Sequence, residues 1–83
     1  MWDSQLIDLF WTRSETAIAE TKKQYGALLH HVSANILSDE RDVEECLSDT
    51  LYAAWTTIPP ERPSCFRAYL CVLARNIWLF TEN

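Results

Sequence analysis

Residues that interrupt secondary structure are scarce in this sequence, and their scarcity limits the folds that the chain can adopt. There is one glycine, Gly26, and the three prolines all lie between Pro59 and Pro63. A sheet of many strands needs frequent turn residues, so this composition favours long helices. Long hydrophobic runs are also missing. The longest, Tyr69 to Leu73, is far too short to span a bilayer, and we expect no membrane partner.

Cysteine is too sparse for a disulfide framework. The chain has three, Cys46, Cys65 and Cys71, without paired spacing. We therefore expect a reducing, cytoplasmic environment. The first residues of the chain also lack the basic region of a signal peptide.

Patterns that carry catalysis or bind metals are missing too. The sequence has no HExxH, no paired CxxC, no glycine-rich phosphate loop and no Ser-His-acid order. His30 and His31 are adjacent, so on a helix their side chains point about 100° apart and cannot share a metal ion. We expect neither an enzyme nor a cofactor nor a metal site.

Positive charge is in deficit. Seven Lys and Arg residues against twelve Asp and Glu residues give a net charge of -5, so the basic footprint typical of nucleic-acid binding is absent overall. The charges are unevenly distributed. Residues 38–50 contain six acids and one base, Arg41, whereas residues 62–79 contain three arginines and no acid. The two parts of the chain should therefore prefer different partners.

The sequence does contain apolar residues at helical spacing. An apolar fraction of 48% and a length of 83 residues indicate one globular domain, spanning residues 1–83. Spacings of three and four predict helices at about residues 3–12, 14–37, 39–57 and 65–80. Short links between amphipathic helices predict an all-α fold, a compact bundle of about four helices.

Capping residues and buried faces can be assigned to these helices. Ser14 and Ser64 are the predicted caps of the second and fourth helices. Gly26 lies inside the second helix, where either a close helix crossing or simple tolerance explains it. The buried stripe of the second helix is Ile18, Tyr25, Leu28, Leu29, Val32 and Ile36. That of the third is Val43, Cys46, Leu47, Thr50, Leu51 and Ala54, and that of the fourth is Phe66, Tyr69, Leu70, Leu73 and Ile77.

Two helices carry a second face. The second face of the third helix lies opposite its buried side and consists of Asp42, Glu45, Asp49 and Tyr52. This second face is either a solvated surface or a docking site for a basic helix. On the fourth helix, exposed arginines beside an aromatic residue suit single-stranded nucleic acid. That second face comprises Arg67, Cys71, Arg75 and Trp78, and the alternative is that Trp78 packs on a neighbouring helix.

The other three tryptophans are assigned to packing. They are expected to pack in the core or at its rim rather than to form a ligand cage: Trp2 and Trp11 lie near the first helix, which staples them to the core, and Trp55 closes the bundle beside Ile58.

The run from Asp42 to Trp55 resembles region 2.2 of bacterial RNA polymerase sigma factors. A helix containing Tyr25-Gly26 precedes it, and the segments that follow at the expected distance are Ile58-Pro59-Pro60, Phe66-Arg67-Ala68-Tyr69-Leu70 and Leu73-Ala74-Arg75-Asn76-Ile77. This succession covers roughly Leu6 to Leu79. It is similar to sigma factors of the extracytoplasmic-function type, particularly the form common in Firmicutes.

The resemblance implies a region-two domain for DNA-templated transcription initiation. In this family the region 2.2 helix docks on the clamp helices, a coiled coil of the RNA polymerase β′ subunit. That assigns polymerase binding to Asp42, Glu45, Ser48, Asp49 and Tyr52. The loop and last helix capture the single-stranded, melted minus-ten promoter element, which assigns DNA binding to Arg62, Ser64, Phe66, Arg67, Tyr69, Arg75, Asn76 and Trp78. Asn76 matches a position that helps to read an upstream promoter base, and an anti-sigma factor is a further candidate partner.

The sequence departs from the family in three respects. It stops at Asn83, where relatives continue with Leu-Asp and a basic helix, and we expect no second domain to read the minus-35 element. Its net charge is negative, so the isolated chain should bind DNA weakly at physiological salt. These departures favour polymerase docking over promoter recognition.

An alternative function is a sigma-like interaction module that binds polymerase or a regulator without opening promoters. The last helix distinguishes the two functions, because promoter opening needs Arg67, Arg75, Asn76 and Trp78 to be exposed. An unrelated helical bundle, the third alternative, predicts no affinity for the clamp helices.

Overall fold

Four helices make up the part of the chain that the structure describes. The computed structural model describes residues 2–81, with side chains described for residues 2–77. It contains α1 (Asp3–Trp11), α2 (Ala17–Ala34), α3 (Glu40–Thr57) and α4 (Phe66–Thr81), and no strand within residues 2–81. The predicted all-α bundle is confirmed. None of these helices is long and apolar enough to cross a membrane.

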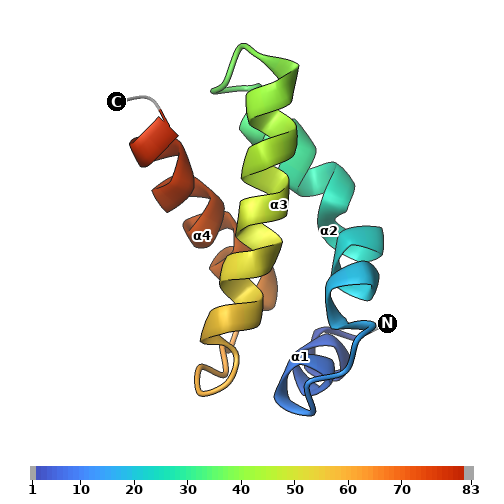
Figure 1. Ribbon diagram of the computed structural model, residues 1–83. Coiled ribbons are helices and arrows are strands. Elements are labelled where there is room, and N and C mark those ends of the chain that lie inside the picture. The colour runs from blue at the N-terminus through green and yellow to red at the C-terminus, as the bar shows by residue number, and fades with distance from the viewer. Residues whose placement is uncertain (1, 82–83) are drawn as a thin grey trace.

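The helices alternate in direction. Figure 1 shows α3 between α2 and α4, running opposite to both, with α1 lying across the end where α2 begins and α3 ends. The domain measures 35 × 21 × 21 Å. The loop between α3 and α4 therefore comes close to α1, although the two are far apart in the sequence.

Helix α3 has the boundaries and the buried face that the sequence predicts. The Asp39 carboxylate accepts a hydrogen bond from the backbone N–H of Arg41 at 2.8 Å and so caps the first turn. The helix ends at Thr57 because Pro59 and Pro60 have no N–H to donate to the next turn. The buried residues are Val43, Cys46, Leu47, Thr50, Leu51 and Ala54, as predicted.

Helix α2 is shorter than predicted at both ends. Ser14 does not cap it, because Ser14 belongs to a preceding turn in which its carbonyl accepts the Ala17 N–H at 3.1 Å. At the other end, the N–H groups of Ile36 and Leu37 both bond the Ser33 carbonyl, which tightens the chain and turns Leu37 into the core. Ile36 is 51% exposed, so its predicted place on the buried stripe was wrong.

An aromatic cluster joins all four helices. The Phe10 ring of α1 lies 6.0 Å from Phe66 of α4 and 6.2 Å from Trp55 of α3, measured between ring centroids. Tyr25 of α2 lies 5.9 Å from Phe66 in an edge-to-face arrangement. Phe10 and Phe66 are fully buried. Such pairs add about 0.5–1.5 kcal/mol each to the stabilisation from burial.

The two N-terminal tryptophans differ in how they pack. Trp11 is 40% exposed and lies at the rim, within the predicted core or rim packing, whereas Trp2 is 77% exposed and does not pack as predicted. The side chains of α1 that pack into the core are Leu6, Ile7 and Phe10. The expectation for Trp55 was correct: it is half-buried next to the core, and Ile58 beside it is fully buried.

Gly26 is tolerated rather than required. A Cβ built on it would meet only the flexible side chain of Lys22, whose Cγ lies 3.4 Å away. No neighbouring helix approaches closely enough to demand a glycine, which answers the question that the sequence left open.

Candidate functional site

A row of acidic residues runs along the outer face of α3. Glu45, Ser48, Asp49 and Tyr52 are exposed, and Asp42 is half-buried. Tyr52 is 64% exposed, which is high for an aromatic ring. We call these five residues the acidic stripe. Their spacing of three and four places them on one side of the helix, away from its buried face.

The carboxylates of the acidic stripe are unpaired within the described residues, unlike several other acids of this chain. Asp3 accepts a hydrogen bond from the Tyr25 hydroxyl, and Asp8 pairs with Arg62. Neither kind of contact involves Asp42, Glu45 or Asp49. The stripe therefore presents three carboxylates to an outside partner with no intramolecular ion pair to break.

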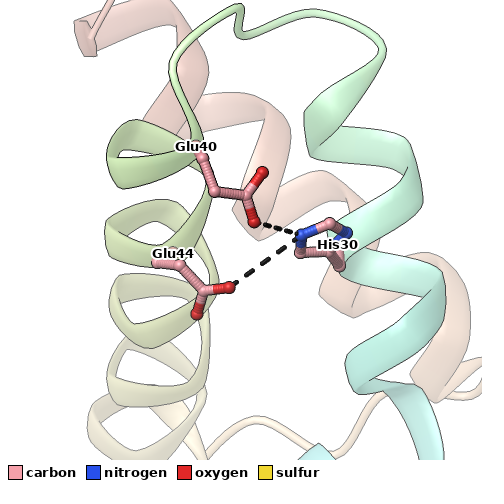
Figure 2. A group of neighbouring side chains, drawn as sticks. All are labelled: His30, Glu40 and Glu44. Atoms are coloured by element: carbon pink, nitrogen blue, oxygen red, sulfur yellow. Dashed lines mark hydrogen bonds and ion pairs between the residues drawn. The ribbon is translucent and has the colours of Figure 1, made fainter.

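Two further acids of α3, both exposed, lie next to α2. His30 Nε2 lies 2.8 Å from Glu40 Oε1 and 3.9 Å from Glu44 Oε1 (Figure 2). The three side chains offer ligand atoms within 4.8 Å of one another, and no other group of three such residues lies this close among the described residues. The imidazole already bonds Glu40, and both carboxylates are more than half exposed. We interpret the group as an ion pair linking α2 to α3.

A second candidate surface is formed by α4 and the loop before it. Ser64, Arg67, Arg75 and Asn76 are exposed. Within the described part of the chain, no ion pair engages Arg67 or Arg75, so both guanidinium groups are available to phosphates. Arg62 is exposed but paired, its Nη2 lying 2.6 Å from Asp8 Oδ1.

Two aromatic residues predicted to contact DNA are placed differently. Phe66 has no exposed surface and packs on Phe10 and Tyr25, so its ring cannot stack on a base in this conformation. This burial confirms the predicted place of Phe66 on the buried stripe of α4, whereas its assignment to DNA binding stays a prediction. Tyr69 is half-buried, and its hydroxyl donates to Thr57 Oγ1 at 2.7 Å. The side chain of Trp78 lies outside the described residues.

A depression of about 300 Å³ lies where the loop meets α4, and the sequence did not reveal it. Ser64 and Tyr69 line it together with four residues that the sequence did not single out: Pro63, Cys65, Ala68 and Val72. Val72 is 55% exposed at its edge. Most of its lining is apolar, and a flat apolar group such as an unpaired base suits that surface.

The fold and these surfaces define a small helical domain with an acidic face on α3 and an arginine-bearing face on α4. No curated protein and no solved structure matches this chain. The sequence profile of the Sigma-70 region 2 family matches residues 22–79, well over half of the chain. The chain therefore belongs to the Sigma-70 region 2 family.

Family membership gives the general function. Sigma-70 region 2 is a non-enzymatic transcription-factor domain that takes part in transcription initiation by binding RNA polymerase, and its partners are the polymerase core and promoter DNA. The matched residues include α3 and most of α2 and α4, so both faces described above lie within the family region.

Proposed function

We propose that this chain is a sigma domain of the extracytoplasmic-function type whose acidic stripe docks on the β′ clamp helices of RNA polymerase. One observation carries the proposal: Asp42, Glu45 and Asp49 form a row of unpaired carboxylates on an exposed helix face. A basic helix laid along that row would meet successive charges at helical spacing. Complementary charges of this kind raise the association rate and set the register of an interface.

Tyr52 supplies the apolar part of the proposed interface. It is the last residue of the acidic stripe, and it is 64% exposed. Tyrosine is a frequent interface anchor because it buries a large area and keeps a hydroxyl for hydrogen bonding. The exposed charges alone are worth little each, about 0.2–1 kcal/mol per pair, so an aromatic anchor beside them is needed for a stable complex.

The second part of the proposal is that α4 and the preceding loop hold the melted minus-ten strand. Arg67 and Arg75 would contact phosphates, and the depression lined by Ser64 and Tyr69 would receive an unstacked base. Flipping a base costs a few kcal/mol, and stacking returns about 1–3 kcal/mol per base. Asn76 is exposed and would present both a donor and an acceptor to a base edge.

Polymerase docking would come first in this mechanism. A chain with a net charge of -5 repels DNA when it is alone. Held on polymerase by the acidic stripe, it would direct the arginines of α4 towards the DNA. Figure 1 shows that α3 and α4 are adjacent helices, which suits one domain that binds two partners at once.

The DNA half is tested with a fluorescent minus-ten non-template strand and core polymerase bound to the full chain. The test variant is Arg67→Gln, Arg75→Gln, and the matched control is Lys22→Gln, Lys23→Gln, which removes two exposed positive charges from α2. We expect the test variant to bind the strand about tenfold more weakly and to show a shallower salt dependence, while the control binds as the parent does. Equal affinities for all three chains would favour the alternative, an interaction module that binds polymerase without holding the promoter strand.

A further inference from the structure

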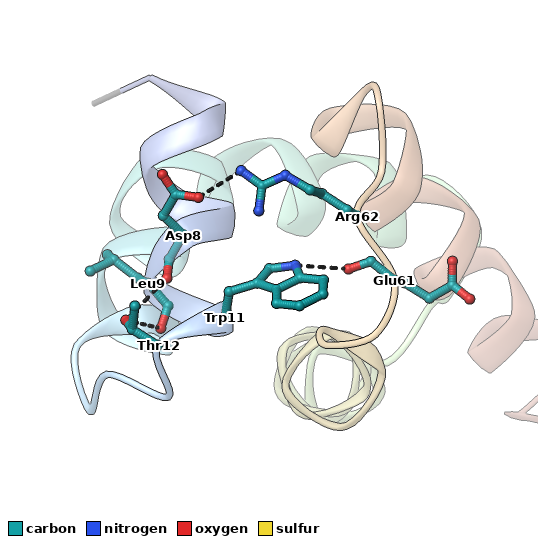
Figure 3. A network of polar contacts seen from close by, with 6 residues as sticks. All are labelled: Asp8, Leu9, Trp11, Thr12, Glu61 and Arg62. Atoms are coloured by element: carbon teal, nitrogen blue, oxygen red, sulfur yellow. Dashed lines mark hydrogen bonds and ion pairs between the residues drawn. The ribbon is translucent and has the colours of Figure 1, made fainter.

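Helix α1 contacts the loop that follows α3 through several side chains. Figure 3 shows Asp8 and Trp11 of α1 reaching towards Arg62 and Glu61. The Trp11 Nε1–H donates to the Glu61 carbonyl at 3.2 Å, and Asp8 Oδ1 lies 2.6 Å from Arg62 Nη2. These contacts join residues about fifty positions apart, and they explain why Trp11 stays at the surface instead of entering the core.

Arg13, just after α1, adds two more hydrogen bonds to the same region. Its Nη1 donates to the carbonyl of Trp55 at 2.8 Å and to that of Ile58 at 2.9 Å, and its guanidinium lies 3.7 Å from the centre of the Trp55 ring. No basic residue lies in the last turn of α3, so Arg13 supplies the positive charge that favours a helix C-terminus.

The backbone of Arg13 is unusual as well. Its φ of 56° is in the left-handed region, and it is the one non-glycine residue with positive φ among the described residues. That conformation is unfavourable for a residue with a Cβ and persists where surrounding contacts enforce it. The hydrogen bonds from its guanidinium to the end of α3 are contacts of this kind.

The loop has few hydrogen bonds of its own. Pro59, Pro60 and Pro63 have no N–H, and within the described residues the backbone bond from Glu61 to the Thr57 carbonyl, at 3.0 Å, is the one made by a loop N–H after Ile58. Its position therefore depends strongly on the side chains of α1 and Arg13.

We propose that α1 and Arg13 position the loop for capture of the promoter strand. This inference rests on the proposed function, because the loop borders the depression that would receive a base. Trp11 and Arg13 are positioning residues: they act through the loop and need not touch DNA. The family profile begins at residue 22, so membership of the family says nothing about this role.

The first experiment measures loop order in the free chain. Trp11→Phe keeps a ring and removes the N–H that bonds Glu61, and Trp2→Phe is the matched control at a tryptophan that is 77% exposed. We expect hydrogen exchange at the Glu61 amide to accelerate about fivefold in Trp11→Phe, as befits one lost hydrogen bond, with α2 and α3 amides unchanged. Unchanged exchange at Glu61 in Trp11→Phe and in Arg13→Lys would overturn the inference.

The second experiment measures function in the complex with core polymerase. We expect Trp11→Phe to bind the minus-ten strand about fivefold more weakly and the clamp helices with parental affinity. A general loss of stability would instead weaken both. A loosened loop with unchanged strand affinity would contradict the functional role of α1. Failure of the parent chain to bind the strand would overturn the DNA half of the proposed function, and Glu61 exchange would still decide whether α1 orders the loop.

Discussion

His30 and Glu40 form an ion pair across the connection between α2 and α3, with His30 Nε2 2.8 Å from Glu40 Oε1. The hydrogen bond to Glu40, the charge of Glu40 and, to a smaller extent, the charge of Glu44 raise the pKa of His30 above its ordinary value. Because the side chains are exposed, the pair acts at the surface and is weakened by salt.

The raised pKa of His30 makes part of the stability pH-dependent. A histidine with a higher pKa in the folded chain binds its proton more tightly there than in the unfolded chain. Its contribution to the free energy of unfolding is therefore complete below the unfolded pKa, about 6.5, as long as the glutamates are ionised. The contribution is lost as the pH rises through the folded pKa. We therefore expect His30→Gln to be less stable than the parent at pH 5.5 and equal to it near pH 8.5, as measured by urea unfolding. A deficit that grows with pH would contradict the assignment.

Gly26 is a position where the structure predicts a gain in stability. An added Cβ meets only Lys22 Cγ, at 3.4 Å, and Gly26 lies in the middle of α2. Gly26→Ala should raise the free energy of unfolding by about 0.5–1 kcal/mol, because alanine loses less backbone entropy in a helix. Thermal and urea unfolding would measure it. A loss of stability would mean that Lys22 cannot move aside.

Thr21 offers a second stabilising substitution. It is fully buried, and its hydroxyl has no hydrogen-bond partner among the described residues. Thr21→Val keeps the shape and removes the unsatisfied hydroxyl, so we expect a gain of about 1 kcal/mol in the free energy of unfolding. Thr21→Ser, which keeps the hydroxyl and removes a methyl group, should lower stability. A destabilised Thr21→Val would show that the hydroxyl is satisfied in solution.

A substitution of Phe66 tests whether this residue serves core packing alone or also DNA binding. Its burial against Phe10 and Tyr25 predicts that Phe66→Leu lowers the free energy of unfolding by about 1 kcal/mol. Under conditions where the variant is folded, its affinity for the minus-ten strand on polymerase should equal that of the parent. A specific loss of strand binding by a folded Phe66→Leu would return Phe66 to the DNA-contacting set.

The sequence was sufficient to predict features that depend on the residue spacing within a single helix. The buried face of α3 follows from its apolar spacing, and the helix lies within the predicted range of residues 39–57. The acidic stripe was visible for the same reason, since residues three and four apart on one helix share a side. Asp42, Glu45 and Asp49 were therefore found without the structure, whereas their binding partner stays a prediction.

Features that depend on how helices meet were not predictable in this way. The contacts of Arg13 with Trp55 and Ile58 link positions 42 and 45 residues apart, and no periodicity connects them. The depression beside Tyr69 likewise depends on the path of the loop. Phe66 satisfied both a core stripe and the family's DNA-contacting segment, and its burial could be confirmed only from the packing, while its DNA contact stays a prediction.

The most direct test of the central claim is the affinity of the full chain for a β′ clamp-helix fragment, measured by calorimetry for the parent and for Asp42→Lys, Asp49→Lys. The matched control is Glu15→Lys, Glu20→Lys, which changes the net charge equally in the turn before α2 and in its first turn. Helicity of each chain is checked by circular dichroism. We predict a dissociation constant near micromolar or below for the parent and the control, and a loss of about tenfold or more for the acidic-stripe variant. No binding by the folded parent, or equal binding by all three chains, would contradict docking through the acidic stripe.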